Sequence, residues 1–359
     1  MKLFLKFLIK RIAVIPLTLL IITMVLYGIV MLMPIESRID LYMPNSNSKV
    51  EGWEERMRER IVETHHLKEP YPVQYFYWAR SLFDSEWGYS PVLGNSVLPE
   101  LTRRSPVTFE LMFYALLLEI PLGLMAGVWS AQRKGKIADY FTRMAAFIGT
   151  SMPDFILAII LLAIFYISLY WFPPERLSIS NHLLVQSDAF QTFTGFLTID
   201  GLLNGRADIT IDAFRHLVLP VFTLSLAHWA TLTRITRSQV LDEMDKDYIT
   251  AAQARGVSSQ DIIWKHAFRN ALGPSLSSSA ISAATLVTSV YVVEKIFNLK
   301  GVSDLITRYG PFVPDAAAVL GFAIYSTLIV LGIMLILDIL QALLIPQIKE
   351  AVFNNNEHF

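Results

Sequence analysis

Six long apolar runs restrict this chain of 359 residues to folds that a lipid bilayer can hold. A helix needs about 20 predominantly apolar residues to cross the hydrocarbon core, and each run comes close to that length. The runs are Ile12–Met33, Leu111–Trp129, Ala145–Phe172, His216–Leu232, Ala271–Val293 and Ala316–Ile345. Charged residues make up only 17% of the chain, against roughly a quarter in soluble domains. The sequence therefore predicts an all-α integral membrane protein with six transmembrane helices.

Charge and cysteine content exclude several classes of protein. A net charge of −1 gives no support for nucleic acid as a partner. The absence of cysteine rules out a disulfide scaffold and cysteine-based metal or redox chemistry. The first apolar run is too long for the core of a signal peptide, so we expect an uncleaved first span.

Basic residues near the spans predict the orientation in the membrane. Lysine and arginine gather before span one, in the link after span two and in the link after span four. These regions share one side of the membrane, which the positive-inside rule makes cytoplasmic. Arg103 and Arg104 count against this orientation, but they lie in a long loop, where charge has little influence. We therefore expect both termini in the cytoplasm.

Two sizeable outer loops are predicted. Pro34–Pro106 contains a candidate amphipathic helix, because Trp53, Met57 and Ile61 are spaced four apart. The second loop, Pro173–Asp212, is polar and rich in turn residues. The expected division of the chain is therefore 1–33 for the N-terminal end and first span, 34–106 for the outer loop, 107–346 for the transmembrane core and 347–359 for a cytoplasmic tail.

The polar link after span four, "AAQARGVSSQDIIWKHAFRN", predicts a helix–turn–helix. Gly256 stands where the end of a helix needs a positive φ, and Ser258 with Asp261 has the spacing of a capping box, although the box prefers Glu or Gln. One predicted face of the first helix consists of Tyr248, Ala251, Ala252 and Arg255, and the apolar face of the second of Ile262, Ile263, His266 and Ala267. We expect these faces to be exposed to the cytoplasm and covered by a partner protein.

The link resembles the EAA loop of ABC-importer permeases, here about residues 240–272. "DYITAAQARGVSSQDIIWKHAFRNALGP" is most similar to the dipeptide/oligopeptide (nickel) subfamily, first-permease type. The motifs "EPYPVQYFYWARSLFDSEWGYS", "RRSPVTFEL", "PLGLMAG", "IGTSMPDF" and "EKIFNLKGVSDL" also follow that pattern, so the resemblance covers nearly the whole chain. It implies the type I importer permease fold with an enlarged outer loop between spans one and two, in a prokaryotic cell membrane.

The resemblance also implies roles and partners. Ala251, Ala252 and Gly256 match the A, A and G of the EAA motif, a coupling helix that docks into an ATPase subunit. Ile262, Ile263 and Lys265–Asn270, which include His266 and Arg269, would continue that contact or tie it to span five. The implied partners are two ATPase subunits, a second permease that is usually a distinct homologue, an external substrate-binding protein and membrane lipid. Thr250 replaces the glutamate of the motif. In "EKIFNLKGVSDL", Lys300 and Ser303 replace a proline and a glycine.

Four ionisable residues at membrane depth are candidates for the path or for packing: Glu119, Asp154, His228 and Asp338. Glu119 or His228 either lines the path, faces the partner permease or is simply neutral. Asp154 follows Pro153 near an end of span three. Asp338 matches an aspartate of the family, and a structural pair with a cytoplasmic-side arginine is the alternative to a functional role. Gly123 and Gly127 suit close helix packing. His65 and His66 raise the possibility of a metal, but a solvated helix end is the simpler reading.

Several alternatives remain open from the residues alone. The link could instead be an ordinary helix pair on the lipid headgroups. Other classes are an ion-coupled secondary transporter and an intramembrane enzyme, but no H-E-x-x-H or G-x-S-x-G motif is present. "RKGKIAD" has Ile137 where a phosphate-binding loop needs Ser or Thr. We therefore expect no cofactor on this chain, with ATP and Mg²⁺ on the partner ATPases, and a substrate that is a peptide, an oligosaccharide or nickel.

Overall fold

The structure is a computed structural model that describes residues 2–40, 42–43, 52–90, 92–307 and 315–344, with only the backbone described for 2–8, 10–11, 278–284 and 340–344. The predicted tail, 347–359, lies outside the described residues. Two compact units divide the described residues. The first contains the described residues of 2–12, 108–299 and 330–344, and the second those of 13–107 and 300–329.

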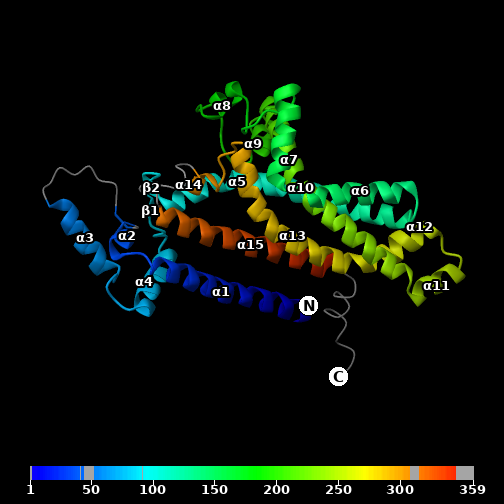
Figure 1. Cartoon of the computed structure of the whole chain (residues 1–359), viewed down its shortest axis with the longest axis horizontal. Helices are drawn as coiled ribbons and strands as arrows, with labels where there is room; N and C mark the ends of the chain where they lie inside the picture. The colour runs from blue at the N-terminus through cyan, green and yellow to red at the C-terminus, as the bar shows by residue number, and fades with distance from the viewer. Residues whose placement is uncertain (1, 41, 44–51, 91, 308–314, 345–359) are drawn as a thin grey trace. The chain divides into compact units, whose positions relative to one another are not determined.

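Helices account for nearly all of the regular structure (Figure 1). In chain order the elements are α1 (Lys2–Val30), α2 (Ile35–Ile39), α3 (Trp53–Thr64), α4 (Tyr71–Phe83), β1 (Tyr89–Ser90), β2 (Asn95–Ser96), α5 (Val97–Gln132), α6 (Ile137–Ser151), α7 (Asp154–Leu161), the π-helix η1 (Leu162–Ser168), α8 (Ile179–Val185), α9 (Leu197–Leu203), α10 (Ala207–Met244), α11 (Asp247–Ala254), α12 (Ser259–Asp261), the π-helix η2 (Ile262–Ala267), α13 (Phe268–Ile296), α14 (Asp304–Thr307) and α15 (Ala316–Leu344). The antiparallel pair of β1 and β2 places Tyr89 opposite Ser96.

Among the described residues, four helices are long and apolar enough to cross a membrane. They are Ile12–Val30 of α1, α5, α10 and Ala316–Ile339 of α15. Counting α6 with α7 and η1 as one bent span raises the number to five. The fifth predicted run, Ala271–Val293, forms most of α13, which is helical but is not among these four. A multi-pass helical membrane protein is therefore established, and the count of six spans stays a prediction.

The predicted third span, about Ala145–Phe172, is broken in the structure. α6 ends at Ser151, α7 begins at Asp154, and the chain bends by 103° between them. Met152 has an extended backbone with ψ of 119°, because a residue that precedes proline is pushed out of the helical region. Pro153 also has a non-helical backbone, with ψ of 139°, and is the N-cap residue of α7. Residues 145–151 of the predicted span therefore belong to α6. α7 and then η1 form the part of the span after the bend.

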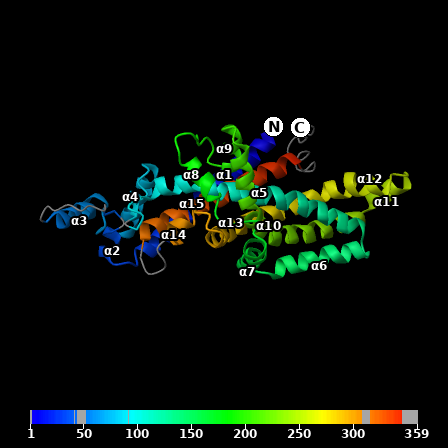
Figure 2. The same cartoon turned by 90° about the horizontal axis from the view of Figure 1, so that it is seen from above.

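α10 is the central helix of the first unit and packs against α6, α7, α9 and α13. Figures 1 and 2 show α6 lying beside the second half of α10. On α5, a Cβ added at Gly127 would lie 2.6 Å from Thr236 Cβ of α10, and one added at Gly123 would lie 2.9 Å from Leu232 Cδ2. The packing role predicted for these two glycines is confirmed, because only glycine allows α5 and α10 to approach this closely.

The predicted amphipathic helix of the second unit is confirmed as α3. Its Ile61 is buried and packs with Ile39 and Leu67. His65 and His66 stack on tyrosine rings, on Tyr42 and Tyr77 respectively. Among the described residues, no three His, Asp or Glu side chains gather where they would hold a metal.

Arg104, which the sequence counted as an outer positive charge, is buried. Its guanidinium pairs with Glu100 at 2.9 Å and with Asp304.

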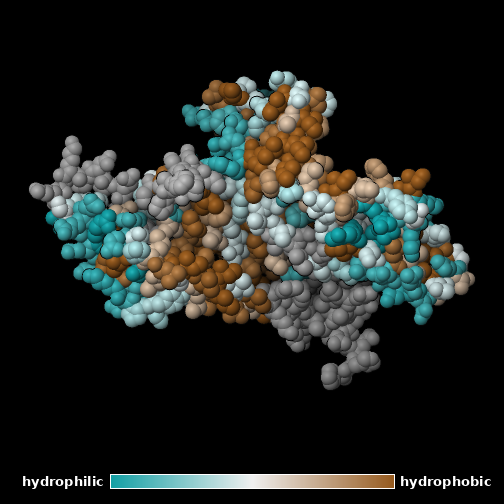
Figure 3. Space-filling view, viewed as in Figure 1, coloured by the Kyte–Doolittle hydropathy of each residue, from teal (hydrophilic) through white to brown (hydrophobic). Residues whose placement is uncertain are grey.

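Between η1 and α10, the second predicted outer loop contains α8 and α9 and a small core of its own. Leu177, Phe190 and Leu197 pack there with residues of α10. Below this loop, Figure 3 shows a brown band of apolar side chains over α7, where Phe155 and Ile159 are exposed within this chain. The apolar surface of α7 is suited to lipid or to another membrane subunit.

Candidate functional site

The predicted helix–turn–helix is confirmed in residues 247–267. α11 ends at Ala254, and Gly256, which follows the C-cap residue Arg255, is left-handed with φ of 78°. The N–H of Val257 donates to the carbonyl of Ala252 at 3.2 Å, and the N–H of Gly256 donates to that of Gln253 at 2.9 Å. This pair of bonds is the Schellman termination of a helix, which requires a positive φ at the glycine position. The turn therefore follows directly from glycine at 256.

The second helix begins at the predicted cap. The backbone N–H of Asp261 donates to Ser258 Oγ at 3.2 Å, and the same hydroxyl donates to Asp261 Oδ2 at 3.0 Å. Asp261 also pairs with Lys265 Nζ at 2.6 Å. This ion pair, followed by the Ser258 hydrogen bond, lowers the pKa of the Asp261 carboxyl. In a capping box, the side chain of the third helical residue accepts from the backbone N–H of the N-cap residue. Here the Asp261 side chain accepts from the Ser258 hydroxyl instead, and the start of the helix remains capped by Ser258.

The expectation that the apolar residues of this segment are exposed is wrong. Ile262, Ile263 and Ala267 are buried within this chain, as are Ile249 and Ala252 of α11. They form one cluster with residues from three long helices: Val128 and Ala131 of α5, Val240 of α10 and Ala271 of α13. The cover that the sequence assigned to a partner is therefore supplied by this chain. We call this cluster the clamp.

A different face of the segment remains exposed. Tyr248, Ala251, Arg255 and Arg269 lie outside the clamp with exposed side chains, and Figure 3 shows α11 and α12 as a largely hydrophilic end of the first unit. His266 is half-buried. Tyr248 Oη donates to Glu243 Oε2 of α10 at 2.6 Å and accepts from Asn270 Nδ2 of α13 at 2.9 Å. Tyr248 thus ties α11 to both long helices that flank it.

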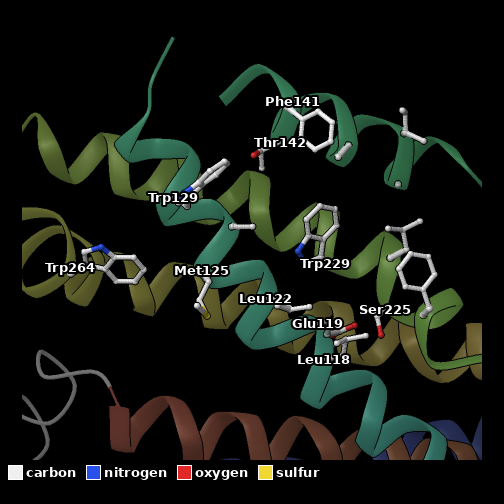
Figure 4. A pocket seen from close by; sticks show the side chains of 16 residues that line it. Leu118, Glu119, Leu122, Met125, Trp129, Phe141, Thr142, Ser225, Trp229 and Trp264 are labelled. Carbon is white, nitrogen blue, oxygen red and sulfur yellow. The ribbon is translucent and has the colours of Figure 1, made fainter. Parts of the chain in front are cut away.

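Glu119, one of the four intramembrane candidates, lines a groove. The groove has a volume of about 840 Å³ and is bounded by α5, α6, α10 and Trp264 of η2. Figure 4 shows Glu119 beside Ser225 of α10, with Trp129, Trp229 and Trp264 on the labelled walls. Only 2% of Glu119 is exposed, and its Oε2 atom has no hydrogen-bond partner among the described residues.

The other three candidates do not line this groove. His228 is buried on α10, and its Nε2 atom has no partner among the described residues. Asp154 is half-buried at the start of α7, and Asp338 is buried on α15. The pairing of Asp338 with a cytoplasmic-side arginine stays a prediction. Sequence reasoning missed the three tryptophans of the groove, whose only signal was their presence within or beside apolar runs.

Comparison with known proteins places the chain in a family. Residues 120–350 match the family described as "Binding-protein-dependent transport system inner membrane component". The chain is 31% identical over 293 residues to the oligopeptide transport system permease protein AppB of Bacillus subtilis (strain 168), covering 81% of this chain and 85% of the relative. It is 33% identical over 288 residues to the di/tripeptide transport system permease protein DppB of Pseudomonas aeruginosa (strain UCBPP-PA14), covering 79% and 82%.

Among solved structures, a chain of the inward-facing MetNI methionine ABC transporter aligns with a TM-score of 0.40 and 15% identity, covering 72% of this chain and 93% of that chain. The family match covers well over half of the sequence, and the curated relatives above are transport permeases rather than enzymes. The chain therefore belongs to the family of binding-protein-dependent transport system inner membrane components and is a permease subunit of an ABC importer.

Proposed function

We propose that this permease forms half of the path of a peptide importer and receives the motion of separate ATPase subunits through residues 247–267. Peptide as substrate rests on the names of the relatives, which transport oligopeptides and di- or tripeptides. The proposed complex contains a second permease, two ATPase subunits that bind ATP and Mg²⁺, and an extracytoplasmic substrate-binding protein. Six spans with both termini in the cytoplasm complete the proposal.

The clamp is the observation that carries the coupling role. A segment that transmits force must be rigid with respect to the helices that it moves. Ile249, Ile262 and Ile263 are nearly inaccessible and pack against α5, α10 and α13. A push on the exposed face of α11 would therefore reach three long helices rather than bend a loose loop.

Ala251→Arg tests the docking of the ATPase. Ala251 is exposed, so arginine at this position leaves the clamp intact while it holds a docked surface away. We expect at least tenfold lower ATP-driven uptake and less co-purified ATPase, at unchanged membrane abundance, because an interface does not tolerate a large charged side chain in its centre. Gln253→Arg is the matched control, since Gln253 is exposed on the same helix outside the predicted face. Normal uptake and ATPase recovery in Ala251→Arg would refute the docking role.

Substrate class needs a separate measurement. The assembled importer, reconstituted with its binding protein in vesicles, should take up labelled di- to pentapeptides when ATP is supplied to the ATPase side. Oligosaccharides and Ni²⁺ should not compete. Competition by either would replace peptide as the substrate and leave the coupling role in place. Uptake that needs an ion gradient and no ATP would instead indicate a secondary transporter.

A further inference from the structure

The groove around Glu119 combines an apolar wall with one buried carboxyl. Its lining comes from α5, α6, α10 and η2 and is apolar almost throughout. Ser225, the hydroxyl next to Glu119 in Figure 4, already donates within the chain, to the carbonyl of Val221 at 2.6 Å. Oε2 of Glu119 has no partner among the described residues, so no donor that lines the groove pairs with this oxygen in the structure.

Burial without a partner is costly for a carboxyl, and in an apolar medium the missing hydrogen bond is not replaced by water. An occupant that fits must therefore bring a hydrogen-bond donor to the depth of Glu119. A lipid acyl chain fits the apolar wall but carries no such donor. A peptide substrate carries donors, but it would leave most of its backbone unpaired against this wall.

A transmembrane helix satisfies both requirements. The backbone hydrogen bonds of a helix are internal, so no backbone donor or acceptor is left unpaired in an apolar groove. A single polar side chain of such a helix can reach the carboxyl. Ala126 of α5 and Ala145 of α6 line the groove, and such small residues let a second helix approach closely. Leu122 and Met125 are 48% and 57% exposed within this chain and offer apolar surface for it to cover.

We propose that this groove receives a transmembrane helix of the second permease subunit, which presents a hydrogen-bond donor to Glu119. The inference rests on the proposed function, which supplies the second permease. It assigns to Glu119 a role in subunit recognition: the carboxyl selects the partner helix that carries the donor at the matching depth.

Photo-crosslinking in the assembled importer tests the location. A photoreactive residue at Met125 should label the second permease. The same residue at Ile159 on α7, which is 56% exposed and lies outside the groove, should label it at least fivefold less. Labelling of lipid alone, or of labelled peptide alone, at Met125 would overturn the inference. If the wild-type complex contains no second permease or ATPase, the proposed function itself fails; if it contains them and Met125 labels lipid or peptide, only the groove inference fails.

Variants at Glu119 test the chemistry. Glu119→Gln keeps an oxygen and gains a donor, so recovery of the second permease should stay within about twofold of wild type. Glu119→Leu leaves the partner's donor unsatisfied and should lower the recovery about tenfold or more. Membrane abundance and protease resistance of the variant chain, expressed alone, separate failed folding from failed association. Equal recovery for Leu and wild type, or labelling at Met125 that Glu119→Leu does not reduce, would refute the assigned role of the carboxyl.

Discussion

Arg237 of α10 and Asp139 of α6 form a bidentate ion pair, with Nε 2.7 Å from Oδ1 and Nη2 2.8 Å from Oδ2. Ser130 Oγ of α5 donates to the same carboxylate at 2.6 Å, and the N–H of Gly135 donates at 3.0 Å. Asp139 is 1% exposed, so its charge depends on these four donors. This carboxylate fixes α5, α6 and α10 to one another beside the clamp and the groove.

Arg237→Leu should destabilise the fold strongly. It leaves Asp139 buried without its cation, which typically costs about 3–5 kcal/mol. Thermal unfolding of the purified protein measures this loss. The double variant with Asp139→Asn should recover much of it, because the uncompensated charge is then gone.

Lys265→Ala is the control for this ion pair. Lys265 and Asp261 are 72% and 42% exposed at their side chains, and an ion pair exposed to solvent contributes little to stability. A larger loss for Lys265→Ala than for Arg237→Leu would contradict the importance given to the buried pair.

Two glycines on one face of α5 should respond differently to alanine. At Gly127 the new Cβ would lie 2.8 Å from the backbone carbonyl of Thr233, which cannot move alone. At Gly123 the three nearest atoms are Cβ, Cγ and Cδ2 of Leu232, of which a change of rotamer can move Cδ2 and Cγ but not Cβ. Gly127→Ala should therefore lower the free energy of unfolding by about 3 kcal/mol or more, which is the upper end of the range that is typical of overpacking. Gly123→Ala should lower it clearly less. Melting temperatures of the two variants, measured side by side, check the order, and equal shifts would argue against close backbone contact at Gly127.

Gly256 should tolerate alanine better than proline. Its φ of 78° is strained for any side chain, but no atom lies within 4 Å of an added Cβ. Gly256→Ala should cost about 1–2 kcal/mol of local stability. Gly256→Pro forbids the positive φ and removes the N–H that donates to Gln253. We expect alanine to retain most ATP-driven uptake and proline to lose it, at equal membrane abundance. Normal uptake with proline would show that the turn is unnecessary for coupling.

Sequence reasoning succeeded where the cause was local. Gly256 determines a turn and Ser258 a helix cap, each within a few residues, so both features were predictable from the neighbouring sequence. The spacing of Trp53, Met57 and Ile61 likewise predicted α3.

It failed where the cause lay far along the chain. The residues that cover Ile262 and Ile263 include Val128 of α5 and Val240 of α10, and an apolar helical face does not reveal whether its cover is internal or external. The same limit applies to Trp264, whose place in the groove depends on α5 and α6. The break at Pro153 had a local signal, but apolar residues on both sides hid it.

The segment around α3 should open more readily at low pH because of His65. This ring stacks on Tyr42 at a centroid distance of 3.7 Å, and burial lowers its pKa from the usual 6.5. The opened segment therefore binds a proton more readily than the closed one. The stabilisation is present above about pH 6.5 and is lost as the pH falls through the lower folded pKa.

Amide hydrogen exchange over residues 53–67, corrected for the intrinsic effect of pH, should accordingly show less protection at pH 5 than at pH 7.5. His65→Phe keeps an aromatic ring against Tyr42 but cannot titrate, so its protection should be the same at both values. His66→Phe is the matched control, because His66 stacks on Tyr77 at 3.8 Å, and it should retain the difference seen in the wild type. If His65→Phe also retains that difference, another group is responsible for the opening at low pH.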